Sequence, residues 1–288
     1  LHALSYLSHT HLRVVSRAVS VFPDGDERIS CFTCCTFDCW GAEGSRQPTQ
    51  ISKRIGIQRI TMIEDTIEWF PREEGWSWKE LSIEYSDATI IELVHRTEGA
   101  FLLKGTELNH RTELDRAYQA HQWFHTFGMA PEAIWVRQTA SRCWLLMKKG
   151  EGVPALFYAD KDQIGNILGR CLRRIHSLPV KRFFHQGNRM LTLMEESNLT
   201  PDFSWSWDLV VSHGDFCLPN VLVDNSGQTQ IIDLGDAGIY DRYYDLYWGI
   251  WSLKFNRFAD QVPSFLDAYG LSQPDEEKMS YIKSICGK

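Results

Sequence analysis

The chain has 288 residues, 43% of them hydrophobic, and a formal net charge of -7 at pH 7. This length suits one large globular domain or two lobes that share a cleft, and no apolar run approaches the roughly 18 residues of a membrane span. The acidic balance and the lack of a strong Lys and Arg cluster exclude a typical nucleic-acid-binding protein. We therefore expect a soluble, cytoplasmic protein whose partners include neither nucleic acid nor a membrane.

Residues 1–61 differ from the rest of the chain. They mix Ser, Thr, Arg and Cys without a sustained period, and they contain turn-rich stretches at 23–26 and 41–48. The first methionine of the chain is Met62. We expect residues 1–61 to be an extension that is poorly ordered or does not belong to the functional domain. A start site assigned too early would explain this, and a genuine extra module is the alternative.

Four cysteines cluster in this extension, at Cys31, Cys34, Cys35 and Cys39. Such a run is compatible with zinc, but zinc sites usually draw their ligands from two separated pairs, and no second pair follows within reach. The interpretation we favour is a poorly ordered extension without metal. The other cysteines are scattered, which predicts reduced thiols in or near the core.

From Met62 onward the sequence changes to short β-rich runs. Apolar residues dominate 89–94 and 99–104, and the polar residues 95–98 separate them. Two apolar runs around a short polar turn are typical of a β-hairpin. The second run ends in Lys104.

A helix is predicted after this hairpin, from about residue 107 to 127. Its apolar residues recur at helical spacing, and it stops at Gly128, shortly before Pro131. Two further strands are predicted around 133–137 and 143–147. The hairpin, the helix and these strands together form a β-rich region.

A glycine-containing break at 149–152 separates this region from a mainly helical one. The predicted helices of the second region span 161–177, 188–197, 243–254 and 263–269. A strand-turn-strand unit at 220–224 and 230–233 lies between them. The pattern predicts an α+β protein with two lobes over a cleft, an N-lobe at 62–148 and a C-lobe at 149–288.

The densest polar constellation lies in the C-lobe. His213, Gly214 and Asp215 are followed by Asn220 in an irregular loop, and Asp233 ends the apolar run Ile231-Ile232. Two loop residues and a strand-end aspartate supply hard oxygen ligands, which suit Mg²⁺. Phosphoryl transfer needs such a metal site, a carboxylate that orients the acceptor hydroxyl, and a lysine for the nucleotide phosphates. The pattern therefore indicates a phosphotransferase.

The strings HGDFCLPNVLVD and IIDLGDAGIYDRYYDL resemble the aminoglycoside 3′-phosphotransferase family of antibiotic kinases. The resemblance covers roughly residues 82–281. It implies a bilobal protein-kinase-like fold that uses ATP and Mg²⁺ to phosphorylate the 3′-hydroxyl of a cationic aminoglycoside, which confers resistance. By this resemblance Asp215 is the catalytic base, Asn220 and Asp233 are metal ligands, and His213 supports the catalytic loop. A monomer or a homodimer would be compatible with it.

The same resemblance assigns the nucleotide-binding residues of the N-lobe. Lys104, at the end of the second hairpin strand, would bind the phosphates. The family pairs this lysine with a glutamate at the position that Ala117 occupies here, so Glu113, one helical turn earlier, is the expected substitute. Asp115 and Glu107 compete for that role, and Glu113 as a solvated surface residue is the alternative.

Two backbone segments complete the predicted nucleotide site. Ser86 lies in a short loop that resembles the phosphate-covering loop of the family, although an ordinary turn serine would look the same. Met147, Lys148 and Gly150 lie in the segment that resembles the family hinge, where backbone groups near Lys148 and Gly150 would bind adenine. Met147 as a plain core residue is the alternative.

Asp241 and Asp245 also match the family, and their expected role is structural. They would cap the helix that begins near Tyr243 and brace the catalytic loop.

Several positions depart from the family pattern. Cys286 and Gly287 stand roughly where the family has an acidic pair that binds the acceptor. Trp251 and Asp236 stand where the family usually has arginines, and Leu102 replaces an aromatic residue of some relatives. These departures put the acceptor in doubt more than the reaction. The alternatives are a kinase of the same fold that acts on another small hydroxylated molecule, and an inactive relative.

Overall fold

The computed structural model describes residues 17–21, 27–31, 75–81, 88–183, 189–197 and 206–286. In the extension, β1 (Arg17–Val21) pairs antiparallel with β2 (Glu27–Cys31). The rest of residues 1–61 lies outside the described residues, and so do Ser86, Gly287 and the cysteines Cys34, Cys35 and Cys39. The predicted role of the extension therefore stays a prediction.

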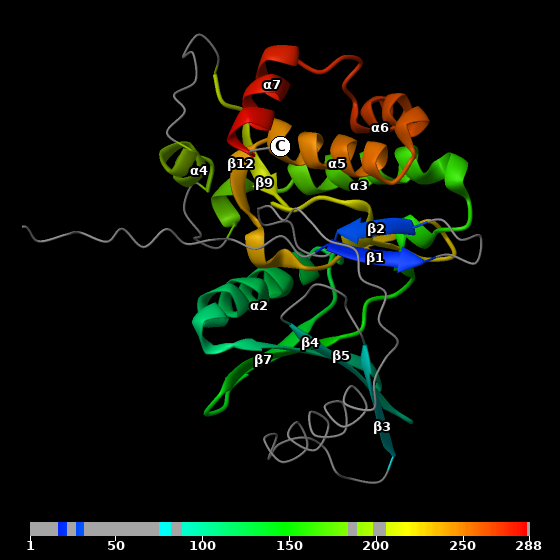
Figure 1. Ribbon diagram of the computed structural model, residues 1–288, viewed down its shortest axis with the longest axis vertical. Helices are drawn as coiled ribbons and strands as arrows, with labels where there is room; N and C mark the ends of the chain where they lie inside the picture. Colours follow the sequence, from blue (N-terminus) through cyan, green and yellow to red (C-terminus); the bar gives the residue numbers. More distant parts are fainter. Residues whose placement is uncertain are drawn as a thin grey trace, which may run out of the picture.

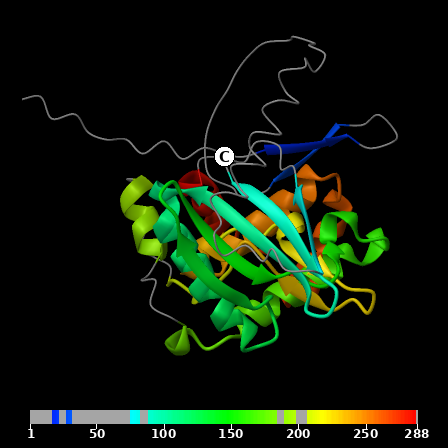
Figure 2. The same cartoon turned by 90° about the horizontal axis from the view of Figure 1, so that it is seen from below.

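The N-lobe is built on a five-stranded antiparallel sheet with the strand order β3-β4-β5-β7-β6. Its strands are β3 (Trp76–Leu81), β4 (Thr89–His95), β5 (Gly99–Glu107), β6 (Ala133–Gln138) and β7 (Arg142–Lys148). The predicted hairpin is β4 and β5, in a register that pairs His95 with Gly99. Seen from below, this sheet lies in front of the helices of the C-lobe (Figure 2).

Helix α2 (Arg111–His125) lies between the sheet and the C-lobe (Figure 1). Side chains alternate along β7, so Trp144 packs in a cluster on one face while Cys143 and Leu145 pack with Leu114 of α2 on the other. The predicted helix from 107 begins with a 3₁₀ turn, η1 (Leu108–His110), before α2. The sheet therefore fixes the helix that faces the C-lobe.

The C-lobe is mainly helical. Its helices are α3 (Ile164–His176), α4 (Arg189–Ser197), α5 (Tyr243–Phe255), α6 (Val262–Tyr269) and α7 (Glu276–Ile285). Its short strands are β8 (Val153–Pro154), β9 (Leu209–Ser212), β10 (Val221–Val223), β11 (Thr229–Ile231) and β12 (Gly238–Asp241). Short 3₁₀ helices connect them: η2 (Ala155–Phe157), η3 (Lys161–Gln163), η4 (Val180–Arg182), η5 (Leu218–Asn220), η6 (Leu234–Asp236) and η7 (Ala259–Gln261). The predicted α+β, bilobal architecture is confirmed.

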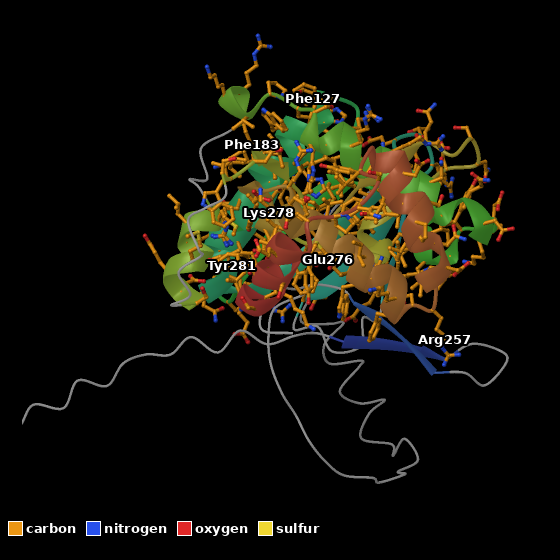
Figure 3. The ribbon with its side chains drawn as sticks, turned by 90° about the horizontal axis from the view of Figure 1, so that it is seen from above. Phe127, Phe183, Arg257, Glu276, Lys278 and Tyr281 are labelled. Atoms are coloured by element: carbon orange, nitrogen blue, oxygen red, sulfur yellow. The ribbon has the colours of Figure 1, made fainter. Side chains whose placement is uncertain are left out.

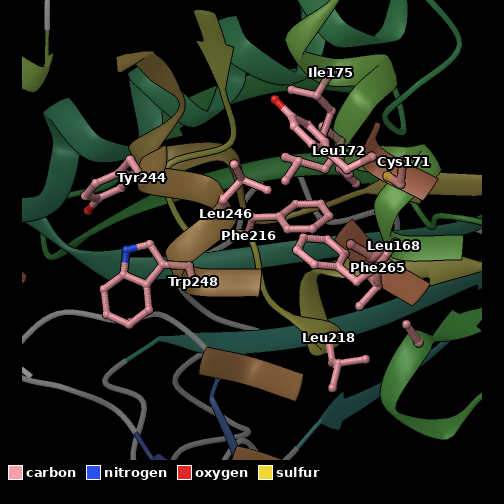
Figure 4. Close-up of a cluster of buried hydrophobic side chains, with 14 of the residues drawn as sticks. Leu168, Cys171, Leu172, Ile175, Phe216, Leu218, Tyr244, Leu246, Trp248 and Phe265 are labelled. Carbon is pink, nitrogen blue, oxygen red and sulfur yellow. The ribbon is translucent and has the colours of Figure 1, made fainter. Parts of the chain in front are cut away.

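Helices α3 and α6 pack closely because glycines face the contact. A Cβ atom at Gly169 would overlap the Phe265 carbonyl oxygen, so any larger residue would force the helices apart. The buried cluster around them includes Leu168, Leu172 and Phe216 (Figure 4). Since Phe216 belongs to the segment that follows Asp215, this core also supports residues 213–220, the predicted catalytic loop.

Helix α7 was not among the predicted helices. Asp275 caps its N-terminus by accepting hydrogen bonds from the amides of Glu277 and Lys278. Lys278 points back to the start of α5, where its Nζ lies 5.5 Å from the ring centre of Tyr243. Figure 3 shows Lys278 and Tyr281 on this helix. None of the described helices is long and apolar enough to cross a membrane.

The two lobes are joined near the C-terminal end of α2. The Ile231 amide donates to the Met129 carbonyl at 2.7 Å, just after α2. Trp123 Nε1 donates to the Arg182 carbonyl at 2.7 Å, and the Trp123 ring meets Phe183 edge-on with centroids 4.7 Å apart. The Trp123 ring also lies 4.7 Å from that of Phe127, and both phenylalanines are labelled in Figure 3. The end of α2 is thus fixed to the C-lobe.

The importance of this core predicts a large effect for Leu172→Ala. The side chain is fully buried, so its truncation should lower the free energy of unfolding by about 2–5 kcal/mol through lost burial and a residual cavity. Leu191→Ala, at a leucine that is 51% exposed, should change it by less than about 0.5 kcal/mol. Urea unfolding of both variants measures the difference. Equal effects would show that α3 does not pack as described.

Candidate active site

The predicted catalytic loop, residues 213–220, follows β9 directly, and a buried carboxylate fixes its backbone. Asp245, in the first turn of α5, accepts hydrogen bonds from the His213 amide at 2.7 Å and from the Gly214 amide at 3.0 Å. His176 Nε2 on α3 lies 3.2 Å from the same carboxylate. Asp241 in turn accepts from the Tyr243 amide at the start of α5. Asp245 therefore braces the loop, and Asp241 accepts from the first amide of α5.

His213 links the catalytic loop to the segment that carries Asp233. Its side chain is fully buried, and its Nε2 lies 3.0 Å from the Ile232 carbonyl oxygen, which can only accept a hydrogen bond. Its Nδ1 accepts from the Asp215 amide at 3.2 Å. Burial also lowers the pKa of His213. The partners therefore assign a neutral ring with the proton on Nε2.

Asp215 and Asn220 lie in direct contact. Asn220 Nδ2 donates to the Asp215 carboxylate at 2.9 Å and to its carbonyl at 3.0 Å. Both side chains are buried, with Asp215 only 3% exposed. Asn220 Oδ1 has no hydrogen-bond partner among the described residues. A buried amide oxygen without a donor is suited to a metal ligand.

Asp233 adopts a left-handed backbone conformation, with φ 58° and ψ 60°. This region is unfavourable for a residue with a side chain, and such residues persist where the surroundings fix them, often at functional sites. The amide of the preceding Ile232 donates to the Asn220 carbonyl at 3.0 Å, which ties the two predicted metal ligands together. This conformation turns the chain sharply into η6.

Lys104 reaches from the N-lobe to this site. Its Nζ lies 2.9 Å from Asp233 Oδ1, and both side chains are 18% exposed. Burial disfavours the charged lysine, but the negative charges of Asp233, Glu113 and Asp236 outweigh this cost and raise the pKa of Lys104. Lys104 is therefore charged, and it joins the lobes across the site.

The negative charge of Glu113 also acts on Lys104. Glu113 lies beside η6: a Cβ atom added to Gly235 would lie 3.3 Å from Glu113 Cγ. Its Oε2 is 3.2 Å from His110 Nδ1. Lys104 thus pairs with Asp233 and Glu113 with His110, and the predicted pairing of Lys104 with Glu113 stays a prediction. Ala117 is buried among the residues between α2 and the sheet.

The predicted hinge lies at the end of β7. Met147 is buried among the side chains that α2 covers, and the Lys148 amide donates to the Glu132 carbonyl at 2.8 Å. A Cβ atom at Gly150 would overlap the side chain of Leu222 and lie 3.0 Å from Pro131. Gly150 therefore allows the lobes to meet closely here. The predicted adenine contacts would use other backbone groups than the Lys148 amide.

Two residues of the site region carried no recognisable signal in the sequence. His176 contacts Asp245 from 69 positions away, and Arg189 contacts Asp236 from 47 positions away. Neither residue belongs to a recognisable motif. Both lie on helices, and the packing of these helices brings them to the loops. Trp251, a departure from the family pattern, stacks on Phe255 with ring centroids 4.8 Å apart.

Comparison with known proteins identifies relatives of this chain. The model of the phosphotransferase enzyme family matches residues 195–282. An aminoglycoside 3′-phosphotransferase of Enterococcus faecalis is 36% identical over 232 residues, which cover 68% of this chain and 87% of that relative. The chain belongs to the aminoglycoside phosphotransferase family. A probable aminoglycoside 3′-phosphotransferase of Lactococcus lactis is 45% identical, but over 71 residues that span only 27% of its length.

Solved structures of aminoglycoside phosphotransferases share the fold. The crystal structure of an aminoglycoside-3′-phosphotransferase of type VIII has a TM-score of 0.62 at 22% identity, covering 77% of this chain and 97% of that one. An aminoglycoside phosphotransferase from Streptomyces rimosus, in complex with ADP and streptomycin, has a TM-score of 0.59 at 17% identity and covers 83% of this chain and 98% of that one. At these identities the likeness establishes the fold alone.

The contact between the two loops predicts that Gly214→Ala is costly. Gly214 has φ +84°, and a Cβ atom there would overlap the Asp236 carbonyl oxygen. Gly227 has a similar φ of +79° with nothing within 4 Å, so Gly227→Ala controls for backbone strain alone. Gly214→Ala should lower the free energy of unfolding by about 1–3 kcal/mol more than the control. Equal losses in chemical denaturation would refute the close approach.

Burial of His121 predicts a specific dependence of stability on pH. This histidine of α2 is fully buried, its Nδ1 lies 3.2 Å from the Pro131 carbonyl, and burial lowers its pKa to about 4. The unfolded chain binds this proton below about pH 6.5 and the folded protein does not. His121 therefore reduces stability as pH falls from about 6.5 to 4, by up to ~1.4 kcal/mol per pH unit.

His121→Gln tests this dependence, because glutamine keeps a donor for the Pro131 carbonyl and cannot take up a proton. Urea unfolding at a series of pH values should give a shallower loss of stability for the variant between about pH 6.5 and 4. Parallel curves for the variant and the parent protein would contradict the role of His121.

Proposed function

We propose that this protein transfers the γ-phosphoryl group of ATP to the 3′-hydroxyl of a cationic aminoglycoside and so confers resistance. The observation that carries the proposal is the buried pair of Asp215 and Asn220, beside the Lys104–Asp233 ion pair. A phosphotransferase needs these groups and little else, because its catalysis is mainly positioning and charge stabilisation. The names of the relatives support the aminoglycoside as the acceptor.

Asp215 is the proposed base. Asn220 Nδ2 holds one carboxylate oxygen, Oδ2, at 2.9 Å and so orients the group. Asp215 would accept the proton of the acceptor hydroxyl as that oxygen attacks the phosphoryl group. His213 supports Asp215 indirectly: its Nδ1 accepts a hydrogen bond from the Asp215 amide and so fixes the backbone of this residue.

The donor set fits Mg²⁺. The oxygen Asn220 Oδ1, which has no hydrogen-bond donor among the described residues, and the carboxylate of Asp233 would hold the ion. When bound, Mg²⁺ neutralises charge on the nucleotide phosphates. Lys104 would then exchange its contact with Asp233 for one with these phosphates. The backbone of 148–150 would bind adenine, and Glu113, Ser86 and Met147 stay predicted members of the nucleotide site.

Two features of the chain bear on the acceptor. The net charge of -7 would suit a cationic acceptor and is also ordinary for a cytoplasmic protein. Of the acidic residues at the start of α7, Asp275 is engaged as the helix cap, while Glu276 and Glu277 are exposed. Trp251 lies in an aromatic stack with Phe255 where the family has an arginine, which favours the second candidate, a kinase of another small hydroxylated molecule. Cytoplasmic location and a monomeric or homodimeric state are further predictions.

Asp215→Asn tests the proposal directly. With Mg-ATP and kanamycin or neomycin, we expect kcat/KM to fall by about 10²–10⁴-fold, because asparagine cannot accept the proton. Asp162→Asn, at an exposed position of η3, should retain full activity. Coupled ADP release measures the rates, and circular dichroism checks the fold.

The outcomes separate the candidates. Turnover of other alcohols alone would favour the second candidate, and full activity of Asp215→Asn would refute the assignment of the base. Absence of both turnover and nucleotide binding in the parent protein would indicate an inactive relative.

A further inference from the structure

Arg189, the first residue of α4, reaches into the junction of the two active-site loops. Its Nη2 lies 3.2 Å from Asp236 Oδ1, and its Nε donates to the Tyr240 hydroxyl at 3.3 Å. The Tyr240 hydroxyl donates in turn to the Asp236 carbonyl at 3.1 Å. Arg189 therefore contacts Asp236 both directly, through the carboxylate, and through Tyr240, at the carbonyl.

The segment that these bonds hold is the one that carries Asp233. Asp236 ends η6, which begins directly after Asp233. The Asp236 carbonyl lies against Gly214, between His213 and Asp215, so closely that a Cβ atom there would overlap it. A shift of Asp236 would therefore move both the metal-binding turn and the backbone of the proposed base.

The stem of Arg189 also packs on the strands that flank the loops. A Cβ atom at Gly238 would lie 2.5 Å from Arg189 Cγ, so only glycine leaves room for it. Gly238 pairs with Ser212, the residue that precedes the catalytic loop. Arg189 thus contacts the end of the metal-binding turn and the strand that is paired with the start of the catalytic loop.

The burial of these groups makes the contacts consequential. The side chain of Arg189 is 13% exposed and that of Asp236 is 22% exposed. Removing one partner leaves the other charge partly desolvated and uncompensated, which favours movement of the segment toward water. Burial raises the pKa of Tyr240, so its hydroxyl stays protonated and continues to donate to the Asp236 carbonyl.

We propose that Arg189 is a positioning residue for phosphoryl transfer: through Asp236 and Tyr240 it holds the turn after Asp233 against Gly214, and so fixes Asp233 relative to Asp215. This role rests on the proposed function, because it concerns the same site. It explains why an acid is accommodated at position 236, since α4 supplies a guanidinium beside it. Arg189 itself does not contact the reacting atoms.

A set of variants tests this role. Arg189→Met keeps the stem on Gly238 and removes the donors, and Asp236→Asn removes the carboxylate charge. Each should lower kcat by about 10-fold or more with a smaller change in the KM for the acceptor, and the double variant should be little worse than either single one. Arg189→Lys should recover part of the loss. Arg170→Met, the same change at an exposed site on α3, should leave kcat unchanged.

Hydrogen exchange gives a readout that does not depend on activity. In Arg189→Met, peptides covering 213–220 and 233–238 should exchange about 10-fold faster or more, while peptides of the N-lobe sheet should not change. Unchanged exchange at both loops would overturn the proposal, and so would an unchanged kcat in a variant that is only less stable. If the parent protein phosphorylates no aminoglycoside, the proposed function fails, and the exchange result still decides the positioning role.

Discussion

The geometry of the site depends on one buried carboxylate, that of Asp245. It is fully buried and accepts hydrogen bonds from two successive amides of the catalytic loop, at His213 and Gly214. A buried charge is tolerated only when donors surround it, so the loop backbone and the carboxylate stabilise each other. His176 adds a third contact from α3. The core of α3, α5 and α6 thereby sets the position of Asp215.

Further cross-links join the catalytic loop to the turn that carries Asp233. The ring of His213 donates to the Ile232 carbonyl, and the Ile232 amide donates to the Asn220 carbonyl. The close contact of Gly214 with Asp236 adds another. These links make two loops, separated in the sequence, into one unit. The strained backbone of Asp233 is a consequence, since the turn must return to the loop within a few residues.

The N-lobe is connected to this unit through few groups. Lys104 is carried by β5, in the middle of the sheet, and pairs with Asp233 across the site. The end of α2 is fastened to the C-lobe by Trp123 and by the Met129 carbonyl. Helix α2 packs against the sheet that carries Lys104, and its C-terminal end is fixed to the C-lobe. Packing therefore sets the distance between Lys104 and Asp233 together with the ion pair.

The sequence by itself determined the features that depend on local pattern. Two apolar runs around a polar turn identified the β4–β5 hairpin. The spacing of Asp215 and Asn220, followed by Asp233 at the end of an apolar run, indicated the chemistry, because a short loop keeps Asp215 and Asn220 close whatever surrounds it. Helix α7 was missed, since its main signal is the single cap Asp275. The sequence could not decide the partner of Lys104 either, because the fold brings two acids, Asp233 and Glu113, near its ammonium group. Only the tertiary structure decided that Lys104 contacts Asp233, that His176 contacts Asp245 and that Arg189 contacts Asp236. These contacts join residues 129, 69 and 47 positions apart, and helix and sheet packing, not local spacing, brings them together.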